Sequence, residues 1–218
     1  MKFARLKPLL GEEALVKLSK ATVAIIGLGG VGGIAAETLA RSGVGHLVIC
    51  DFDAVEESNI NRQIVANTKT IGQNKALLLA KMIEEINPDC SLTVISQPYY
   101  NFLKVYNIKY LIDAIDDVKS KIALIKDCLD AQIIFISAMG AGNKLNPNLV
   151  NITTLNKTTY DPLARILRQE FKKQTINVVS SVEEVGNNKF SQVNSYMPTV
   201  ATFGLLCADF IIKEIIRS

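Results

Sequence analysis

The chain has few of the residues that build metal centres and disulfide-bonded folds: 4 cysteines, 1 histidine and no tryptophan among 218 residues. The cysteines, Cys50, Cys90, Cys128 and Cys207, lie far apart and form no Cys-x-x-Cys pair, so the sequence predicts no structural zinc site. Cys207 lies in the apolar run Leu205-Leu-Cys-Ala208, where a thiol is usually buried and unreactive, and we expect the same of the other three.

A long uninterrupted apolar run is also absent. The longest, at roughly residues 200–212, contains Asp209 and is too short to span a bilayer, and residues 1–5 lack the apolar core of a signal peptide. We therefore expect a soluble, cytoplasmic protein without membrane insertion. The formal net charge of +3 permits a nucleic-acid partner but does not predict one.

Strand and helix patterns alternate along the chain, whose residues are 49% hydrophobic. We expect a single α/β domain over residues 1–218, with a Rossmann-like, mostly parallel sheet and helices on both faces. The predicted strands are 22–27, 46–51, 91–97, 109–113 and 132–137, with two more near 149–155 and 176–180. The predicted helices are 30–43, 73–86, 118–130, 162–173 and 199–216. Residues 1–140 form the predicted nucleotide-binding core, and residues 141–218 a substrate-side elaboration with the C-terminal helix.

Two of the predicted helices carry basic residues away from their apolar stripes. In helix 118–130 these residues are Lys119, Lys121 and Lys126. In helix 162–173 they are Arg165, Arg168 and Lys172. Both patterns are typical of solvated surface helices. For the second helix, contact with the backbone of a nucleic acid is the alternative.

The order of elements in residues 22–62 is typical of a nucleotide-binding domain: an apolar strand, a glycine-rich turn, a helix and a second strand that ends in an acid. Gly27, Gly29, Gly30 and Gly32 let the backbone turn tightly and approach a phosphate, whose charge is met by N–H groups at the helix N-terminus. Asp51 follows Gly32 by 19 residues, where its carboxylate can accept hydrogen bonds from ribose hydroxyls. A dehydrogenase that binds NAD would show the same residues.

Charged residues further along favour a triphosphate over a dinucleotide. Arg62 offers a planar fork to phosphate oxygens, Lys75 offers a point charge, and Asp116 follows a predicted strand and can hold Mg²⁺. Each could instead be an ordinary surface charge, and Asp117 could serve only as a helix N-cap. Asp53 has two open roles, assistance at the ribose or organisation of the turn that follows it.

Five motifs carry a resemblance to a known superfamily. They are Gly27-x-Gly29-Gly30-Val-Gly32, Asp51-x-Asp53, Asn59-x-x-Arg62-Gln63, Gly72-x-x-Lys75 and Asp113-x-x-Asp116. Through them, residues 1 to about 140 resemble the adenylation domain of the ubiquitin-activating-type enzymes. Three further segments resemble one branch of that superfamily, the tRNA threonylcarbamoyladenosine dehydratases. These are Phe3-x-Arg5 ahead of Leu9-Leu-Gly11, the run from Ser137 to Pro147, and Asp161-Pro-Leu-Ala-Arg165-x-x-Arg168.

The resemblance implies an ATP-dependent dehydratase that cyclises N6-threonylcarbamoyladenosine in tRNA through an adenylated carboxylate. It implies ATP and Mg²⁺ as cofactors, tRNA as a partner, and a homodimer in which Arg5 reaches the neighbouring subunit's nucleotide. The resemblance leaves open whether a monovalent cation binds and whether a sulfur-transfer protein is a partner. The implied nucleotide-binding residues are Arg5, Gly27, Gly29, Gly30, Gly32, Asp51, Asp53, Asn59, Arg62, Gln63 and Lys75. The implied catalytic residues are Arg62, Lys75 and Asp116, of which Asp116 is also the implied metal ligand.

Two other functions compete with this interpretation. An adenylyltransferase that activates the C-terminus of a ubiquitin-like sulfur carrier would share the motifs, although such relatives usually carry two Cys-x-x-Cys pairs. An NAD-dependent oxidoreductase would share the glycine turn and Asp51. The chain also departs from the dehydratases at Val65, where relatives commonly have a histidine two residues after the Arg-Gln pair.

Overall fold

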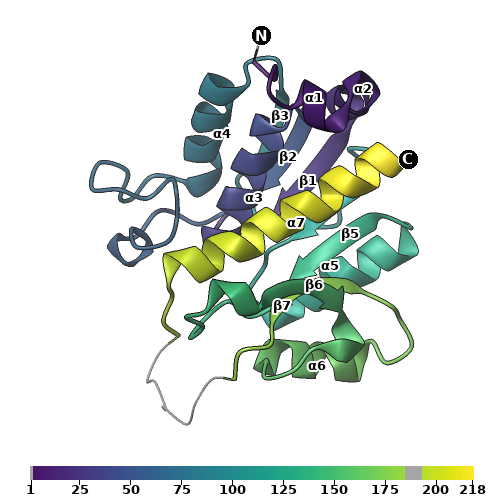
Figure 1. Cartoon of the computed structure of the whole chain (residues 1–218). Helices are drawn as coiled ribbons and strands as arrows, with labels where there is room; N and C mark the ends of the chain where they lie inside the picture. Colours follow the sequence, from purple (N-terminus) through teal and green to yellow (C-terminus); the bar gives the residue numbers. More distant parts are fainter. Residues whose placement is uncertain (1, 185–192) are drawn as a thin grey trace.

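A seven-stranded sheet forms the centre of the computed structural model, which describes residues 2–184 and 193–218 (Figure 1). The strands are β1 (Thr22–Ile26), β2 (His46–Cys50), β3 (Ser91–Ile95), β4 (Tyr110–Asp113), β5 (Ile134–Ala138), β6 (Val150–Thr154) and β7 (Asn177–Ser181). Their order across the sheet is β3-β2-β1-β4-β5-β7-β6, and β6 runs antiparallel to β7 while the other neighbours are parallel. The predicted α/β fold with a mostly parallel sheet is confirmed, including the two strands after residue 147.

Helices cover both faces of the sheet, as predicted. They are α1 (Lys7–Leu10), α2 (Glu12–Lys20), α3 (Gly30–Arg41), α4 (Lys75–Ile86), α5 (Val118–Asp130), α6 (Pro162–Glu170) and α7 (Met197–Arg217), with short 3-10 turns η1 (Glu57–Asn59), η2 (Pro147–Leu149) and η3 (Leu155–Lys157). Figure 1 shows α3, α4 and α7 on one face, and α5 and α6 on the other. Within the part of the chain that the structure describes, no helix combines the length and the apolar character needed to cross a bilayer.

Several helix boundaries differ from the prediction by one to three residues. The helix predicted from residue 73 begins at Lys75, because the Asn74 side chain caps it by accepting a hydrogen bond from the Leu77 N–H. The helix predicted to reach residue 173 ends at Glu170. The N-terminal helices α1 and α2 were not predicted.

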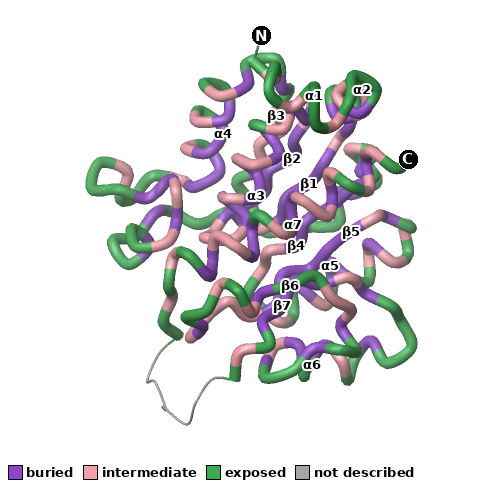
Figure 2. The backbone as a smooth tube through the Cα atoms, in the orientation of Figure 1, coloured by how far each residue is buried: buried purple, intermediate pink, exposed green. Residues whose placement is uncertain are grey.

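Alternate residues of each central strand face opposite layers of core. On β1, Ile25 packs with the helices α3, α4 and α7, whereas Ala24 packs with α5 and α6. On β2, Ile49 and Val48 divide in the same way. Because both faces are covered, the strands are almost continuously buried (Figure 2), and each fully buried Ile contributes about 1.5–3 kcal/mol.

Helix α7 packs closely on α3. A Cβ at Gly204 of α7 would lie 2.5 Å from the Val31 carbonyl oxygen, so only glycine lets the two helices approach this far. At the first turn of α7, Val200 would meet a Cβ on Gly30 at 2.5 Å. The long C-terminal helix therefore begins beside the turn between β1 and α3.

Candidate active site

The turn between β1 and α3 requires glycine at two positions. Gly27 has a φ of +86°, and a Cβ there would lie 2.7 Å from the Ala114 carbonyl oxygen. A Cβ on Gly32 would lie 1.8 Å from the carbonyl oxygen of Gly27. Gly29 is the N-cap of α3 and supplies no side-chain acceptor to the first helical N–H groups. The turn thus has the geometry of a phosphate cradle at a helix N-terminus.

The loop that carries Arg62 and Gln63 packs directly on this turn. A Cβ on Gly30 would lie 3.0 Å from the Arg62 carbonyl oxygen, and one on Gly29 would lie 3.7 Å from Nε2 of Gln63. Gln63 is buried, and its Oε1 has no hydrogen-bond partner among the described residues. An unsatisfied buried amide oxygen costs about 1–3 kcal/mol, so the site fits a ligand that donates a hydrogen bond here.

Asn59, predicted to bind nucleotide, is buried and shapes its own loop. Its Oδ1 accepts a hydrogen bond from the Glu56 N–H at 3.1 Å, and its Nδ2 donates to Ser58 Oγ at 3.3 Å. These contacts close a capping box around η1. In this structure the Asn59 side chain therefore supports the loop that presents Arg62.

Asp51 links the end of β2 to the glycine turn. Its Oδ2 accepts a hydrogen bond from the Leu28 N–H at 2.7 Å, and its Oδ1 accepts one from the Asp53 N–H at 2.8 Å. Burial raises the pKa of Asp51, although both hydrogen bonds and the nearby Lys75 charge act against that shift. The carboxylate thus holds the turn in place, and its remaining lone pairs can accept hydrogen bonds from a ligand.

Lys75 has a partner that its position in the sequence does not reveal. Its Nζ lies 2.9 Å from Asp53 Oδ2, and the Lys75 N–H donates to the Asp53 carbonyl oxygen at 3.0 Å. The side chain of Lys75 is 7% exposed and that of Asp53 is 51% exposed. Asp53 therefore organises the approach to α4, which is one of its two predicted roles, and its half-exposed carboxylate neutralises the lysine.

Arg62 lies half-buried at the edge of the turn. Its Nη1 donates hydrogen bonds to the Ser58 carbonyl oxygen at 2.7 Å and to Asn61 Oδ1 at 3.1 Å. These bonds hold the guanidinium on its own loop and leave its other N–H groups available. Val65, which stands in place of the family histidine, is buried in the core.

Asp116 lies in the loop after β4. The same loop touches the turn, since the carbonyl of Ala114 faces Gly27. Asp116 is exposed and has no hydrogen bond or ion pair within residues 2–184 and 193–218. Its neighbour Asp117 caps α5 by accepting a hydrogen bond from the Ser120 N–H at 2.8 Å, as predicted for a helix N-cap.

Arg5 is not brought to these residues. The neighbouring Phe3 ring packs against Gly43, in the connection between α3 and β2, and Lys2 pairs with Asp89 ahead of β3 at 2.5 Å. These contacts lie at the end of the sheet where the strands begin, whereas the glycine turn follows the end of β1. The exposed Arg5 therefore lies far from the turn of its own chain.

A buried charge network lies beneath the site, and the sequence pattern did not predict it. Lys121 was predicted on a surface helix, and this is wrong: its side chain is 0% exposed, and Nζ donates to Asp113 Oδ2 at 2.7 Å, to Ser137 Oγ at 3.1 Å and to the Ala138 carbonyl oxygen at 3.1 Å. Ser137 Oγ also donates to Asp113 Oδ2 at 2.6 Å. The network ties the ends of β4 and β5 to α5, directly before the loop that carries Asp116.

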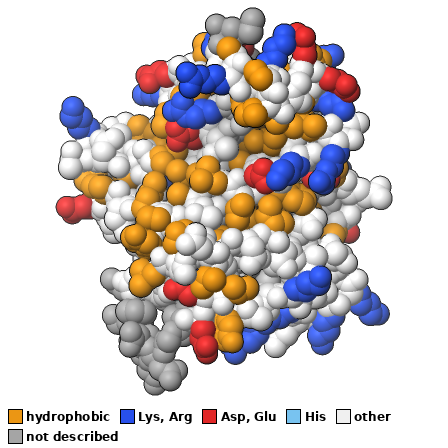
Figure 3. Space-filling view, in the orientation of Figure 1, with side chains coloured by type: hydrophobic (Ala, Val, Ile, Leu, Met, Phe, Trp, Pro, Cys, Tyr) orange, Lys and Arg blue, Asp and Glu red, His pale blue; other side chains and the backbone are white. Residues whose placement is uncertain are grey.

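The basic stripe predicted on helix 162–173 is only partly present. Lys172 lies beyond the end of α6. Arg168 turns back along the helix and donates to the Thr158 carbonyl oxygen at 2.8 Å and to the Thr158 hydroxyl. Arg165 is exposed, and Figure 3 shows several Lys and Arg side chains toward the lower right of the face that it draws.

A phosphate cradle, an acid at the end of β2, and Arg, Lys and Asp side chains on the surrounding loops define a nucleotide-binding domain of the adenylating class. The sequence pattern of the ThiF family matches residues 3–218. The chain is 36% identical to the tRNA threonylcarbamoyladenosine dehydratase of Bacillus subtilis (strain 168), over 99% of this chain and 94% of that protein. The chain belongs to the ThiF family and, within it, to the tRNA threonylcarbamoyladenosine dehydratases.

Solved structures agree with this assignment. The tRNA N6-threonylcarbamoyladenosine dehydratase of E. coli in complex with AMP superimposes with a TM-score of 0.93 at 33% identity, covering 99% of this chain and 94% of that one. The complex of the same E. coli protein with ATP gives a TM-score of 0.92 with the same coverage. The adenylation fold extends over almost the whole length of both chains.

Proposed function

We propose that this protein is a cytoplasmic, ATP-dependent dehydratase that cyclises N6-threonylcarbamoyladenosine in tRNA. One observation carries the proposal: the loops that contain Arg62 and Asp116 touch a single glycine turn at the end of β1, and Lys75 at the start of α4 is joined to that turn through Asp53 and Asp51. The Oε1 of Gln63 beside that turn has no hydrogen-bond partner among the described residues, which supports a polar ligand there. The E. coli relative that binds ATP supports ATP as that ligand.

The chemistry begins with the carboxylate of the threonylcarbamoyl group, which is a poor electrophile until one oxygen joins a good leaving group. That oxygen attacks the α-phosphorus of ATP, the bond to pyrophosphate breaks, and an acyl-adenylate forms. A nucleophilic atom of the same threonylcarbamoyl group then attacks the acyl carbon and loses its proton, and AMP leaves. The substrate loses one water overall. Because ring closure is intramolecular, no cysteine nucleophile is needed, and the four cysteines are buried.

The residues around the turn have separate roles in this proposal. The Arg62 guanidinium and the Lys75 ammonium neutralise the charge that builds up on the phosphates. Asp53 moves aside to release Lys75, which its 51% exposed side chain permits. Asp51, already fixed by Leu28 and Asp53, accepts hydrogen bonds from the ribose hydroxyls.

The residues present also fit a Mg²⁺ ion. The Asp116 carboxylate is exposed beside the turn and has no protein partner among the described residues, and Mg²⁺ prefers one or two carboxylates together with phosphate oxygens. Bound there, the ion would supply positive charge to the phosphates. Asp116 would hold it, while Arg62 and Lys75 act on the phosphates directly.

The test is mass analysis of tRNA nucleosides after incubation with ATP, in which threonylcarbamoyladenosine should lose one water. Arg62→Ala and Asp116→Ala should each lower turnover about 10²- to 10³-fold without changing the melting temperature. Arg41→Ala is the matched control, since Arg41 pairs with Glu37 on the outer surface of α3. Turnover like that of the unmodified enzyme in Arg62→Ala would contradict the proposed roles. Pyrophosphate release with a small protein ending in Gly-Gly, but not with tRNA, would favour a sulfur-carrier adenylyltransferase.

The position of Arg5 makes a homodimer part of the proposal, because only a second copy could bring this arginine to a nucleotide. Arg5→Ala and Arg62→Ala should each be inactive alone. When they are mixed and exchanged, roughly a quarter of the sites should carry both arginines and recover activity. A mixture that stays inactive although size-exclusion chromatography shows exchanged dimers would remove Arg5 from the site.

A further inference from the structure

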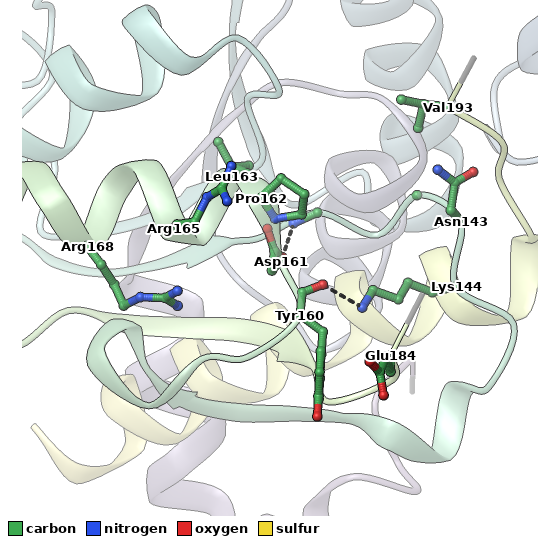
Figure 4. A pocket seen from close by; sticks show the side chains of 12 residues that line it. Asn143, Lys144, Tyr160, Asp161, Pro162, Leu163, Arg165, Arg168, Glu184 and Val193 are labelled. Carbon is green, nitrogen blue, oxygen red and sulfur yellow. Dashed lines mark hydrogen bonds between the residues drawn. The ribbon is translucent and has the colours of Figure 1, made fainter. Parts of the chain in front are cut away.

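A second site lies at the same edge of the sheet. The described residues form a cleft of about 640 Å³ after β5, between the loop Gly140–Lys144 and the start of α6 (Figure 4). Pockets of this size hold ligands as large as a nucleotide. The lining includes three basic side chains and one exposed aromatic ring: Lys144, Arg165, Arg168 and Tyr160.

Tyr160 is held in a conformation that a bulky residue seldom adopts. Its φ is +50°, in the left-handed region, and its side chain leaves the residue 53% exposed. Such backbone persists only where the surroundings fix it, and here they do. The Nζ of Lys144, a residue 2% exposed, donates to the Tyr160 carbonyl oxygen at 3.3 Å and to that of Glu183 at 2.5 Å.

The residue after Tyr160 is fixed as well. Asp161 is buried, and its carboxylate accepts hydrogen bonds from the Gly140 N–H at 2.8 Å and the Ala164 N–H at 2.9 Å. Both sides of the Tyr160 backbone are thus anchored while the ring stays in solvent. A rigid aromatic surface costs little conformational entropy when a flat ligand stacks on it.

Basic side chains lie on both sides of Tyr160. In Figure 4, Lys144 and Arg168 reach toward Tyr160 from opposite sides. Arg168 is held by Thr158, and Arg165, one turn earlier on α6, has no ion pair within the described part of the chain. Two acids also line the cleft, Asp161 and Glu184. The negative charge of Asp161 is engaged as the N-cap of α6, so the three basic side chains outweigh the remaining carboxylate and the cleft favours an anion.

The segment Asn194-Ser195, called the strap below, connects the cleft with the nucleotide site. The Asn143 N–H donates to the Asn194 carbonyl oxygen at 2.8 Å. One residue further, the carbonyl oxygen of Ser195 accepts a hydrogen bond from Asn61 Nδ2 at 3.1 Å. Asn61 precedes Arg62, so a ligand in the cleft lies next to the loop that borders the glycine turn.

We infer that this cleft binds one nucleotide of single-stranded RNA, with its base stacked on Tyr160 and a backbone phosphate at Arg165 and Arg168. An unpaired base stacked on an aromatic ring beside arginine is the usual chemistry of single-stranded RNA recognition. The inference rests on the proposed function, since it places the modified adenosine beside the activated phosphate. Lys144 is a positioning residue, because it acts on the ligand through the backbone of Tyr160.

The experiment measures binding of a fluorescent tRNA anticodon-arm hairpin that carries threonylcarbamoyladenosine, by anisotropy, with the full chain. Tyr160→Ala should bind about 5- to 150-fold more weakly, and Tyr160→Phe, which keeps the ring, should bind like the unmodified protein. Tyr100→Ala is the matched control, since Tyr100 is 55% exposed on the loop after β3. Arg165→Ala should lower the slope of log Kd against log salt by about 1, and Lys81→Ala, on the outer side of α4, should not.

Kinetics separate this inference from the proposed function. Tyr160→Ala should raise KM for tRNA and leave KM for ATP and ATP-dependent thermal stabilisation unchanged. If the unmodified enzyme removes water from the nucleoside and Tyr160→Ala binds the hairpin equally well, the cleft assignment is overturned and the proposed function stands. If the hairpin binds through Tyr160 but no water is lost, the function fails and the RNA site stands. A hairpin that does not bind at all overturns the cleft assignment, and loss of water from tRNA then decides the proposed function by itself.

Discussion

Replacing Lys121 with methionine removes the ammonium group from the buried network and keeps most of the length of the side chain. Among the described residues, the Asp113 carboxylate, 0% exposed, then keeps hydrogen bonds only from Ser137 Oγ and the Ile115 N–H. A buried carboxylate that has lost its cation is strongly destabilising because burial has already removed its hydration. The folded state therefore loses more than the three hydrogen bonds of the Lys121 Nζ.

The expected loss is about 3–5 kcal/mol in the free energy of unfolding, as for other buried pairs broken on one side. For a chain of this size this corresponds to a melting temperature lower by about 6–20 °C. The double variant Lys121→Met with Asp113→Leu removes both charges, so it should be more stable than Lys121→Met alone. The loop that carries Asp116 follows this network, so turnover in the single variant should fall as well.

Urea denaturation, followed by far-UV circular dichroism, measures the free energy of unfolding of both variants. Lys119→Met is the control, because Lys119 is exposed on the same helix and should change stability by less than about 0.5 kcal/mol. If the free energy of unfolding of Lys121→Met lies within about 1 kcal/mol of that of the unmodified protein, the buried pair does not have the energetic role assigned to it. A double variant less stable than the single one would refute the argument from the unpaired charge.

Three further predictions concern the turn, the thiols and a helix cap. Gly32→Ala should abolish the rise in melting temperature that ATP produces, because its Cβ would lie 1.8 Å from the Gly27 carbonyl oxygen; an unchanged rise would contradict the geometry. Burial raises the pKa of the Cys90 thiol to about 11 and that of Cys50 to about 12, whereas unfolded thiols ionise near about pH 8.5. The unfolded chain therefore releases these protons first, so the free energy of unfolding should fall as pH rises from about 8.5 toward 11. Urea titrations across that range measure it, and a constant or rising value would count against buried thiols. Asn74→Ala should destabilise the protein by about 1 kcal/mol through the lost cap of α4, measured in the same titrations, and no change would argue against the cap.

The sheet and the glycine turn could be predicted because both depend on local patterns. The apolar run before Gly27 and the acid at position 51 are visible in one short window of sequence, and the structure places them as expected. The roles of Arg62, Lys75 and Asp116 stay predictions. Their neighbourhood could be foreseen, since residues after parallel strands meet at one edge of the sheet.

Partners that come from distant segments could not be predicted. Lys121 lies off the apolar stripe of its helix, but it is covered because the ends of β4 and β5 meet above it and supply Asp113 and Ser137. The pairing of Lys75 with Asp53 likewise depends on how the loop after β2 folds back onto α4. Helical periodicity describes one element at a time and contains no information on such tertiary contacts.

The packing of α7 has a consequence for synthesis of the protein. This helix buries Phe203, Cys207 and Ile211 against the sheet, and the strap before it joins the two sites. A ribosome makes these residues after nearly everything they cover, so a nascent chain still lacking them presents an open apolar layer and an incomplete cleft after β5. Catalytic competence should thus arise only after α7 has left the exit tunnel and docked.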